Sequence, residues 1–171
     1  MELLKYLKIS DKSKVMTIRK SITGILSATK IQRKFLCTGI SIPEIVEFDI
    51  NKGYGYILAD GETMIGYCAV MINDGPAYAD IKGQRLTDGD FMVYHRVAIA
   101  EAYLTKGMAQ EMMRQIENYA LNHHISSVRV DTNFDNKGML HLFDKVGYAY
   151  CGEVVLAGAL RKAYEKVLPQ K

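Results

Sequence analysis

Residues 91–123 read FMVYHRVAIAEAYLTKGMAQEMMRQIENYALNH, and this stretch decides the fold. The segment from Phe91 to Ile99 is rich in β-branched and aromatic side chains and contains no glycine or proline, which predicts a strand. From Met108 onward the apolar residues recur at intervals of four, which predicts a helix that ends near His123. Gly107 lies at the junction. The order is therefore strand, glycine-containing turn and helix.

The start of this helix is a candidate anion site. The first N–H groups of a helix have no intrahelical acceptor, and the helix dipole places partial positive charge beside them. A phosphate group is the usual anion at such a position. A single glycine before a helix also fits an ordinary strand-to-helix connection, so this segment alone leaves both interpretations open.

The junction resembles motif A of the GNAT superfamily, the acyl-CoA-dependent N-acetyltransferases, whose pattern is Gln/Arg-x-x-Gly-x-Gly/Ala. The matching residues are Leu104, Thr105, Lys106, Gly107, Met108 and Ala109. Leu104 departs from the pattern, because the family has a polar side chain there. The resemblance implies that backbone amides of this loop bind the pyrophosphate of coenzyme A (CoA), and Lys106 keeps a cation in the loop.

A second segment, Asn136 to Tyr148, resembles motif B of the same superfamily, Asn-x-x-Ala-x-x-Leu-Tyr-x-Lys-x-Gly-Phe. The matching residues are Asn136, Leu142, Lys145 and Gly147, with Tyr148 as the closing aromatic. Met139 replaces a small residue, and Phe143 replaces the tyrosine that many members use as a general acid. Two motifs in the correct order, separated by one strand, identify the chain as a GNAT member of the bacterial single-domain type.

The resemblance implies a GNAT fold: an α/β protein with a mixed, mostly antiparallel sheet, flanking helices and a central parallel pair of strands that splay apart. Sequence pattern alone predicts an α/β protein with a mixed sheet. The length of 171 residues suits one domain spanning residues 1–171.

The periodicity and turn residues predict the remaining elements along the chain. The first are a strand at Leu3–Ile9, a helix capped by Ser10 or Asp11 with Val15, Ile18, Ile22 and Ile25 on its inner face, and a helix capped by Ser41. Two strands follow, at Tyr54–Ala59 and Thr63–Ile72, joined around Asp60-Gly61. A polar connection is expected at Tyr78–Asp90, and the last strands at Ser127–Thr132, Tyr148–Leu156 and Ala163–Leu168. Leu160–Leu168 also fits a helix.

Composition and charge narrow the class of protein. Three cysteines without C-x-x-C spacing favour free thiols and a cytoplasmic protein, without a metal site. No signal peptide is visible, and no apolar run approaches the ~20 residues of a membrane span. Residues 1–40 carry nine Lys/Arg and two Asp/Glu. This basic third suits nucleic acid or CoA, but a solvated helix face is the favoured interpretation, and we expect no nucleic-acid partner.

Acetyl transfer from a thioester to an amine requires the amine to lose a proton first. At a lysine-like pKa, about one molecule in 10³ is neutral at pH 7. His95 is the candidate base, because it lies on the strand that borders the acceptor in the family and its ordinary pKa suits the task. Arylalkylamine acetyltransferases carry histidine at the matching place. The alternative for His95 is a structural histidine bonded to a neighbouring carbonyl.

The resemblance assigns further roles by position. Backbone groups of Val97, Ala98 and Ile99 are expected to pair with pantetheine, and the Asn136 side chain to lie near the CoA arm or simply to cap its helix. Phe143 is expected beside the thioester, where Tyr148 or Cys151 could stand in as the acid. The candidates for the acceptor pocket are Phe35 and Tyr78.

Several other polar residues have simpler interpretations. Asp80, Asp88 and Asp90 suit either a cationic acceptor or loop solvation. His123 and His124 follow the central helix, where cations complement its dipole, which is favoured over metal binding. His141 is expected on the outer face of its helix.

The sequence therefore predicts an N-acetyltransferase that moves an acetyl group from acetyl-CoA to a primary amine, either a small molecule or a peptide amino group, by direct attack. The alternative is a GNAT-fold protein that binds acyl-CoA as a sensor without turnover, which Leu104 and Phe143 keep open. A homodimer is compatible with the sequence.

Overall fold

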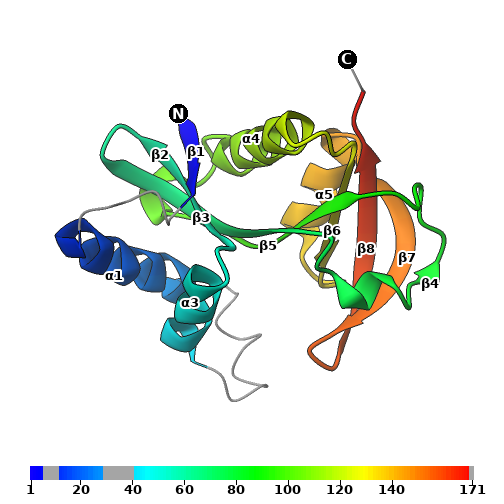
Figure 1. Cartoon of the computed structure of the whole chain (residues 1–171), viewed down its shortest axis with the longest axis horizontal. Helices are drawn as coiled ribbons and strands as arrows, with labels where there is room; N and C mark the ends of the chain where they lie inside the picture. Colours follow the sequence, from blue (N-terminus) through cyan, green and yellow to red (C-terminus); the bar gives the residue numbers. More distant parts are fainter. Residues whose placement is uncertain (6–11, 29–40, 170–171) are drawn as a thin grey trace. The chain divides into compact units, whose positions relative to one another are not determined.

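The computed structural model describes residues 1–5, 12–28 and 41–169. These residues form two compact units, shown in Figure 1: the first comprises Met1–Val70 with Arg96–Gln115, and the second comprises Met71–His95 with Ile116–Lys171. The predicted cap at Ser10 or Asp11, Phe35 and Cys37 lie outside the described residues.

The first unit contains an antiparallel arrangement of β1 (Glu2–Lys5), β2 (Gly55–Asp60) and β3 (Thr63–Ile72). The hairpin between β2 and β3 differs by one position from the prediction. Asp60 pairs with Thr63, so the loop residues are Gly61 and Glu62, and Gly61 carries the positive φ of 57°. The glycine takes the left-handed position because it has no Cβ to clash there.

Two helices, α1 (Lys12–Ala28) and α3 (Ile42–Asn51), lie side by side in this unit (Figure 1). The predicted cap of α3 is confirmed: the Ser41 side chain accepts from the Glu44 N–H, and the Glu44 side chain accepts from the Ser41 N–H. One cluster of buried side chains joins the helices to the strands, and its members are Ile22, Leu26, Ile42, Val46, Ile50, Ile57, Tyr67 and Ala98.

The stretch that decides the fold forms as predicted. It contains β5 (Phe91–Ile99), the 3-10 turn η3 (Glu101–Tyr103) and α4 (Met108–Asn122). The helical phase is confirmed by the fully buried side chains of α4, which are Met112, Met113, Ile116 and Ala120. These positions recur at the spacing of one helix face.

The second unit is built on β6 (Ser127–Thr132), β7 (Ala149–Leu156) and β8 (Ala159–Val167). The predicted parallel pair is confirmed, with Phe91–Tyr94 of β5 beside Ser127–Val130 of β6. The pairs β6 with β8 and β7 with β8 are antiparallel. The mixed, mostly antiparallel sheet of the expected fold class is therefore confirmed.

Two predictions for this unit need correction. First, β8 begins at Ala159, so the final strand is longer than predicted and the helical alternative is wrong. Second, the 3-10 turn η2 (Pro76–Tyr78) and the short strand β4 (Lys82–Gly83) interrupt the predicted polar connection. β4 pairs with β7, where a Cβ on Gly83 would lie 2.0 Å from the Cys151 carbonyl oxygen. Only glycine permits that close backbone approach.

The sheet of the second unit has two faces of different chemistry. On one face, α5 (Lys137–Lys145) packs Phe143 against Tyr148 and Tyr164, with ring centroids 5.7 and 5.0 Å away. The other face is polar. Along β6, Ser127, Arg129 and Asp131 alternate with two buried valines, as side chains on opposite faces of a strand must.

Among the described helices, none is both long enough and apolar enough to cross a membrane.

Candidate active site

The motif A loop in the first unit contains two residues with left-handed backbone conformations. Thr105 and Gly107 have φ values of 63° and 76°. The Gly107 carbonyl accepts the Glu111 N–H at 3.0 Å, so the helical hydrogen bonds begin at Gly107. Within the described part of the chain, the N–H groups of residues 105–109 have no backbone acceptor. No atom lies within 4 Å of where a Gly107 Cβ would be, so this loop is open.

The side chains of this loop explain how it tolerates the departure at Leu104. The Leu104 side chain is exposed, so it blocks no donor of the loop. The Lys106 ammonium lies 5.5 Å from the centre of the Tyr103 ring, which keeps a positive charge beside the open amides. The loop therefore retains backbone donors and a cation, and both suit a phosphate.

Arg96 interrupts β5 with a φ of 58°, between the candidate base and Val97–Ile99. A positive φ is uncommon for a non-glycine residue within a strand and requires support from its surroundings. The Arg96 guanidinium donates two hydrogen bonds to the fully buried Asp49 carboxylate, at 2.8 and 2.5 Å. The Tyr67 hydroxyl donates to the same carboxylate at 2.8 Å. Burial, then the Asp49 charge, raises the pKa of Tyr67 well above its usual value.

Sequence reasoning missed this anchor, although a signal was available. Asp49 lies on the apolar stripe of α3, one residue before Ile50 and three after Val46. A carboxylate at such a position is almost never fully buried without a partner, and here the partner is a guanidinium. The positive φ of Arg96 itself has no local sequence signal.

His95, in the second unit, has a buried carboxylate as its partner. Its Nδ1 lies 2.9 Å from Asp131 Oδ1, and the two side chains are 9% and 0% exposed. The structural alternative, a histidine bonded to a backbone carbonyl, is not the arrangement at this nitrogen. Because an ionised carboxylate only accepts, Nδ1 carries a proton and Nε2 is left as the acceptor nitrogen of the neutral ring.

Asp131 also binds two further groups. Arg161 Nη1 donates to its Oδ2 at 2.8 Å, and the Tyr78 hydroxyl donates to its Oδ1 at 3.4 Å. Tyr78 was a sequence candidate for the acceptor pocket, and the second unit brings it to the carboxylate that holds His95. Burial, then the Asp131 charge, raises the pKa of Tyr78 well above its usual value, so the phenol donates rather than ionises.

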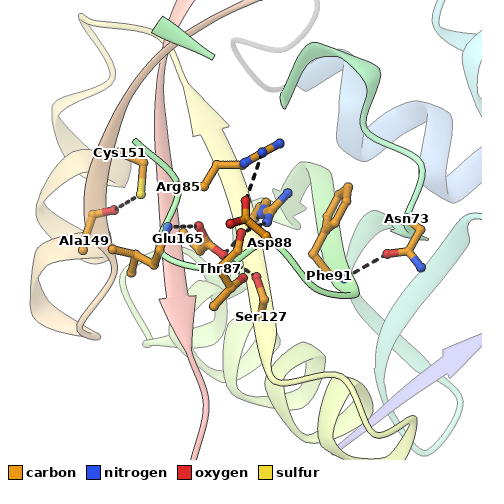
Figure 2. A network of polar contacts seen from close by, with 11 residues as sticks. Asn73, Arg85, Thr87, Asp88, Phe91, Ser127, Ala149, Cys151 and Glu165 are labelled. Carbon is orange, nitrogen blue, oxygen red and sulfur yellow. Dashed lines mark hydrogen bonds and ion pairs between the residues drawn. The ribbon is translucent and has the colours of Figure 1, made fainter. Parts of the chain in front are cut away.

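A second polar cluster lies on the same face and is drawn in Figure 2. Glu165 accepts hydrogen bonds from the Leu86 N–H at 2.7 Å, Thr87 Oγ1 at 2.6 Å and Ser127 Oγ at 2.5 Å (Figure 2). Arg129 Nε lies 3.3 Å from the same carboxylate. Burial opposes ionisation of Glu165, but these donors together hold its pKa below the usual value.

A cavity of about 330 Å³ opens beside this cluster. It is lined by the rings of Tyr78 and Phe91, by Arg85 and Arg129, and by the backbone turn at 73–76. The Arg129 guanidinium lies 4.0 Å from the centre of the Phe91 ring. Arg85 pairs with Asp88 at 3.0 Å (Figure 2). Asp90 accepts a hydrogen bond from the Asn73 side chain at 2.9 Å, so both acidic residues have partners nearby.

The motif B residues have structural contacts of their own. The Asn136 side chain caps α5 by accepting from the Met139 N–H at 3.4 Å, and it donates to Thr132 Oγ1 at 3.1 Å. Phe143 is fully buried in its aromatic cluster. Tyr148 is 5% exposed, and burial followed by the Glu117 charge raises its pKa, which makes its hydroxyl a weaker acid than an ordinary phenol.

The remaining candidates have contacts or exposure of their own. Burial raises the pKa of the Cys151 thiol, whose Sγ lies 3.5 Å from the Ala149 carbonyl oxygen. His123 Nδ1 lies 2.8 Å from the Tyr119 carbonyl oxygen at the end of α4, as expected for a helix-terminal histidine. His141 is exposed on α5, as predicted. In the described segments, no group of three or more His, Cys, Asp and Glu side chains could hold a metal ion.

The chain has relatives among known protein families and solved structures. Residues 29–148 match the sequence model of the Acetyltransferase (GNAT) family. No curated protein matches the chain significantly. Among solved structures, a GNAT-family acetyltransferase from Streptococcus agalactiae 2603 is 26% identical, with a TM-score of 0.73 over 92% of this chain and 90% of that chain.

Two more distant structures share the fold. Aminoglycoside 6'-acetyltransferase type Ii is 13% identical, with a TM-score of 0.68 over 100% of both chains. A chain of the NatC complex bound to Gag peptide and CoA is 16% identical, with a TM-score of 0.63 over 99% of this chain and 100% of that chain. The family match covers more than half of the sequence and includes motif A and motif B. The chain belongs to the GNAT family of acetyltransferases.

Proposed function

We propose that this acyltransferase moves the acetyl group of acetyl-CoA to a primary amine, either a small molecule or a peptide amino group. The observation that carries the proposal is the arrangement of His95, whose Nδ1 is held by Asp131 so that Nε2 remains free to accept a proton. This is the arrangement that a general base requires. The two fold relatives fit the proposed acceptor classes, since one acetylates an aminoglycoside and the other is bound to a peptide.

The motif A loop is the proposed site for the pyrophosphate of acetyl-CoA. The fit is chemical: open N–H groups at residues 105–109, no obstruction at Gly107 and the Lys106 charge all favour an anion. Val97, Ala98 and Ile99 are proposed to bind pantetheine, and Asn136 and Phe143 to lie near its thiol end. When bound, acetyl-CoA supplies an acetyl group already activated as a thioester.

The protons balance as follows in the proposed reaction. His95 Nε2 takes one proton from the acceptor ammonium, and the neutral amine then attacks the thioester carbonyl carbon. The C–N bond forms, the C–S bond breaks, and the second nitrogen proton goes to the departing thiolate. The proton on His95 returns to solvent. The thiolate needs little help, because expelling a thiol of pKa near 8.5 unprotonated at pH 7 costs roughly 2 kcal/mol. A phenylalanine at position 143 is therefore compatible with turnover.

The test begins with a thiol-release assay, using acetyl-CoA and a panel of small amines, polyamines and peptides. With an accepted amine, His95→Ala should lower kcat/KM by about 10²–10⁴, the usual contribution of a placed general base. The loss should shrink as pH rises toward the pKa of the acceptor, because solution then supplies neutral amine. His141→Ala is the matched control, since His141 is exposed on α5.

Two outcomes would contradict the proposal. A His95→Ala enzyme with an unchanged pH–rate profile would remove His95 as the base. Binding of acetyl-CoA without thiol release for any amine would instead support the non-catalytic sensor.

A further inference from the structure

We infer that Asp131 is a positioning residue for catalysis: it fixes His95 in the tautomer whose Nε2 can accept the acceptor's proton. This inference rests on the proposed function, because it assumes that His95 is the base. Asp131 lies on β6, belongs to neither family motif and is not one of the candidates named from the sequence.

Strand register explains how the two side chains meet. The last parallel pair joins Tyr94 of β5 to Val130 of β6, and His95 and Asp131 are the next residues on each strand. Successive side chains on a strand point to opposite faces, so both leave the face that holds Tyr94 and Val130. Their contact at 2.9 Å is on the polar face, away from the aromatic cluster around Phe143.

The other partners of Asp131 favour its ionised form. Both carboxylate oxygens accept, Oδ1 from His95 and Tyr78 and Oδ2 from Arg161. A guanidinium can only donate, and it stays charged in proteins. The Arg161 guanidinium 2.8 Å from Oδ2 therefore favours the charged carboxylate over the protonated carboxyl. An ionised Asp131 keeps the proton on His95 Nδ1.

The same charge helps when His95 takes up a proton. An imidazolium formed in this buried position would be costly without a nearby negative charge. Asp131 provides that charge and stays ionised, so the proton remains on the histidine. Arg161 holds the other carboxylate oxygen, Oδ2, and Tyr78 donates to the oxygen that contacts His95.

Stability alone is a weak reason for this cluster. Removing charged groups from water costs so much that a buried ion pair is often no better than packed apolar side chains. The Arg161 and Asp131 side chains are 4% and 0% exposed, so both charged groups of this pair are removed from water. A role in setting the state of His95 accounts for the burial, and a purely structural role predicts different results in the experiments below.

The first measurement is made on the wild-type protein, and a variant serves only to assign its signals. In the wild-type protein labelled with ¹⁵N-histidine, long-range ¹H–¹⁵N spectra at pH 8 report which ring nitrogen carries the proton. His95 is identified by the signals missing in His95→Gln. We expect a proton on Nδ1 and a lone pair on Nε2. A wild-type His95 with its proton on Nε2 would overturn the inference.

The second measurement is kinetic. Asp131→Asn keeps the size of the side chain but lets its amide donate to Nδ1, which favours the wrong tautomer. We expect kcat/KM to fall about 10²–10⁴-fold, with the ¹⁵N spectrum showing the changed tautomer. In a His95→Ala background, Asp131→Asn should cause no further loss of activity. Tyr78→Phe, which removes only one donor to Asp131, should lower kcat/KM by less than tenfold.

The outcomes separate the inference from the proposed function. If His95→Ala is inactive but Asp131→Asn retains wild-type kcat/KM, the inference is wrong and the base assignment stands. If Asp131→Asn lowers activity equally with and without His95, Asp131 acts independently of His95 and the inference is wrong. If His95→Ala is fully active, the base assignment itself fails. If Asp131→Asn does not fold, the wild-type tautomer decides the inference.

Discussion

Asp49 and Asp131 are buried acidic residues, and each contacts one side chain of β5. Asp49 binds Arg96 and thereby supports a positive φ within the strand. Asp131 binds His95, the residue immediately before Arg96. At the scale of single residues, two consecutive residues of β5 thus each bind a buried carboxylate. They lie in the segment that carries the proposed base and the proposed pantetheine-binding backbone. Neither aspartate belongs to a family motif.

Gly107 is the residue whose substitution tests the phosphate site. Gly107→Asp should weaken acetyl-CoA binding at least tenfold, because a carboxylate beside the open amides repels the pyrophosphate. Isothermal calorimetry gives the dissociation constants. The φ of 76° already strains any side chain, so Gly107→Ala is the control for strain without charge.

Gly107→Ala should cost roughly 1 kcal/mol of stability, with a smaller loss of affinity than Gly107→Asp. Gly89→Asp adds the same charge at an exposed position with open space around it, and it should bind like wild type. Wild-type affinity in Gly107→Asp would rule out phosphate binding at this loop.

At the scale of elements, the polar face of the second unit joins β6 and β8 to the connection that precedes β5. Glu165 of β8 receives hydrogen bonds from Leu86 and Thr87 of that connection and from Ser127 of β6. Sequence periodicity predicted a polar, solvated connection. Groups of this connection instead donate hydrogen bonds to the Glu165 carboxylate, because a carboxylate buried away from solvent needs donors from the protein.

The lowered pKa of Glu165 predicts how stability depends on pH. A carboxylate whose pKa is lower in the folded state stabilises the fold above its unfolded pKa, and that contribution is lost as pH falls through the folded pKa. Glu165→Gln should therefore be less stable than wild type at pH 7, by about 1.5–3 kcal/mol, the value of hydrogen bonds to a charged group.

The difference in unfolding free energy between wild type and Glu165→Gln should narrow as pH falls below the ordinary glutamate pKa of about 4.3 and through the lower pKa of folded Glu165. Urea melts of both proteins at several pH values measure this difference in unfolding free energy. Glu153→Gln on β7 is the control, because within the described chain the Glu153 side chain has no hydrogen bond or ion pair, and its melts should follow wild type at every pH. A pH-independent difference for Glu165→Gln would show that Glu165 is not ionised in the folded protein.

At the scale of the whole molecule, three elements run from one compact unit into the other: β3, β5 and α4. Continuous elements favour cooperative unfolding, so we propose that residues 1–171 behave as one domain. Among the described residues, each unit contains one buried free thiol that can report on this, Cys68 in the first and Cys151 in the second. Burial raises the pKa of both thiols, which suppresses their reactivity in the folded state.

Cys68 and Cys151 should therefore become reactive toward a maleimide at the same urea concentration, measured by mass spectrometry of the separate peptides. Cys37, which we also expect to be a free thiol, gives a third peptide. A lower midpoint for either Cys68 or Cys151 would show that the two units unfold separately. The native protein without reductant should show no disulfide-linked peptides.

The elements that the sequence determined by itself are those with strong local patterns. The bounds of β5 and of the strand at Ser127–Thr132 follow from runs of strand-forming residues between breakers, and the inner face of α4 follows from helical spacing. The Ser41 cap follows from chemistry within three residues. Motif A and motif B likewise identified the family, because each is a short pattern in which backbone and side chains act together.

Tertiary structure alone decided which residues meet across the chain. The pairing of β4 with β7 depends on two glycines that allow their backbones to approach, and no periodicity predicts it. The Arg96–Asp49 anchor and the His95–Asp131 pair join residues far apart in sequence. Their contacts depend on strand register and helix placement, and one step of register would turn each side chain to the opposite face. The sequence could name His95 as the base, but only the folded sheet supplies the carboxylate that orients it.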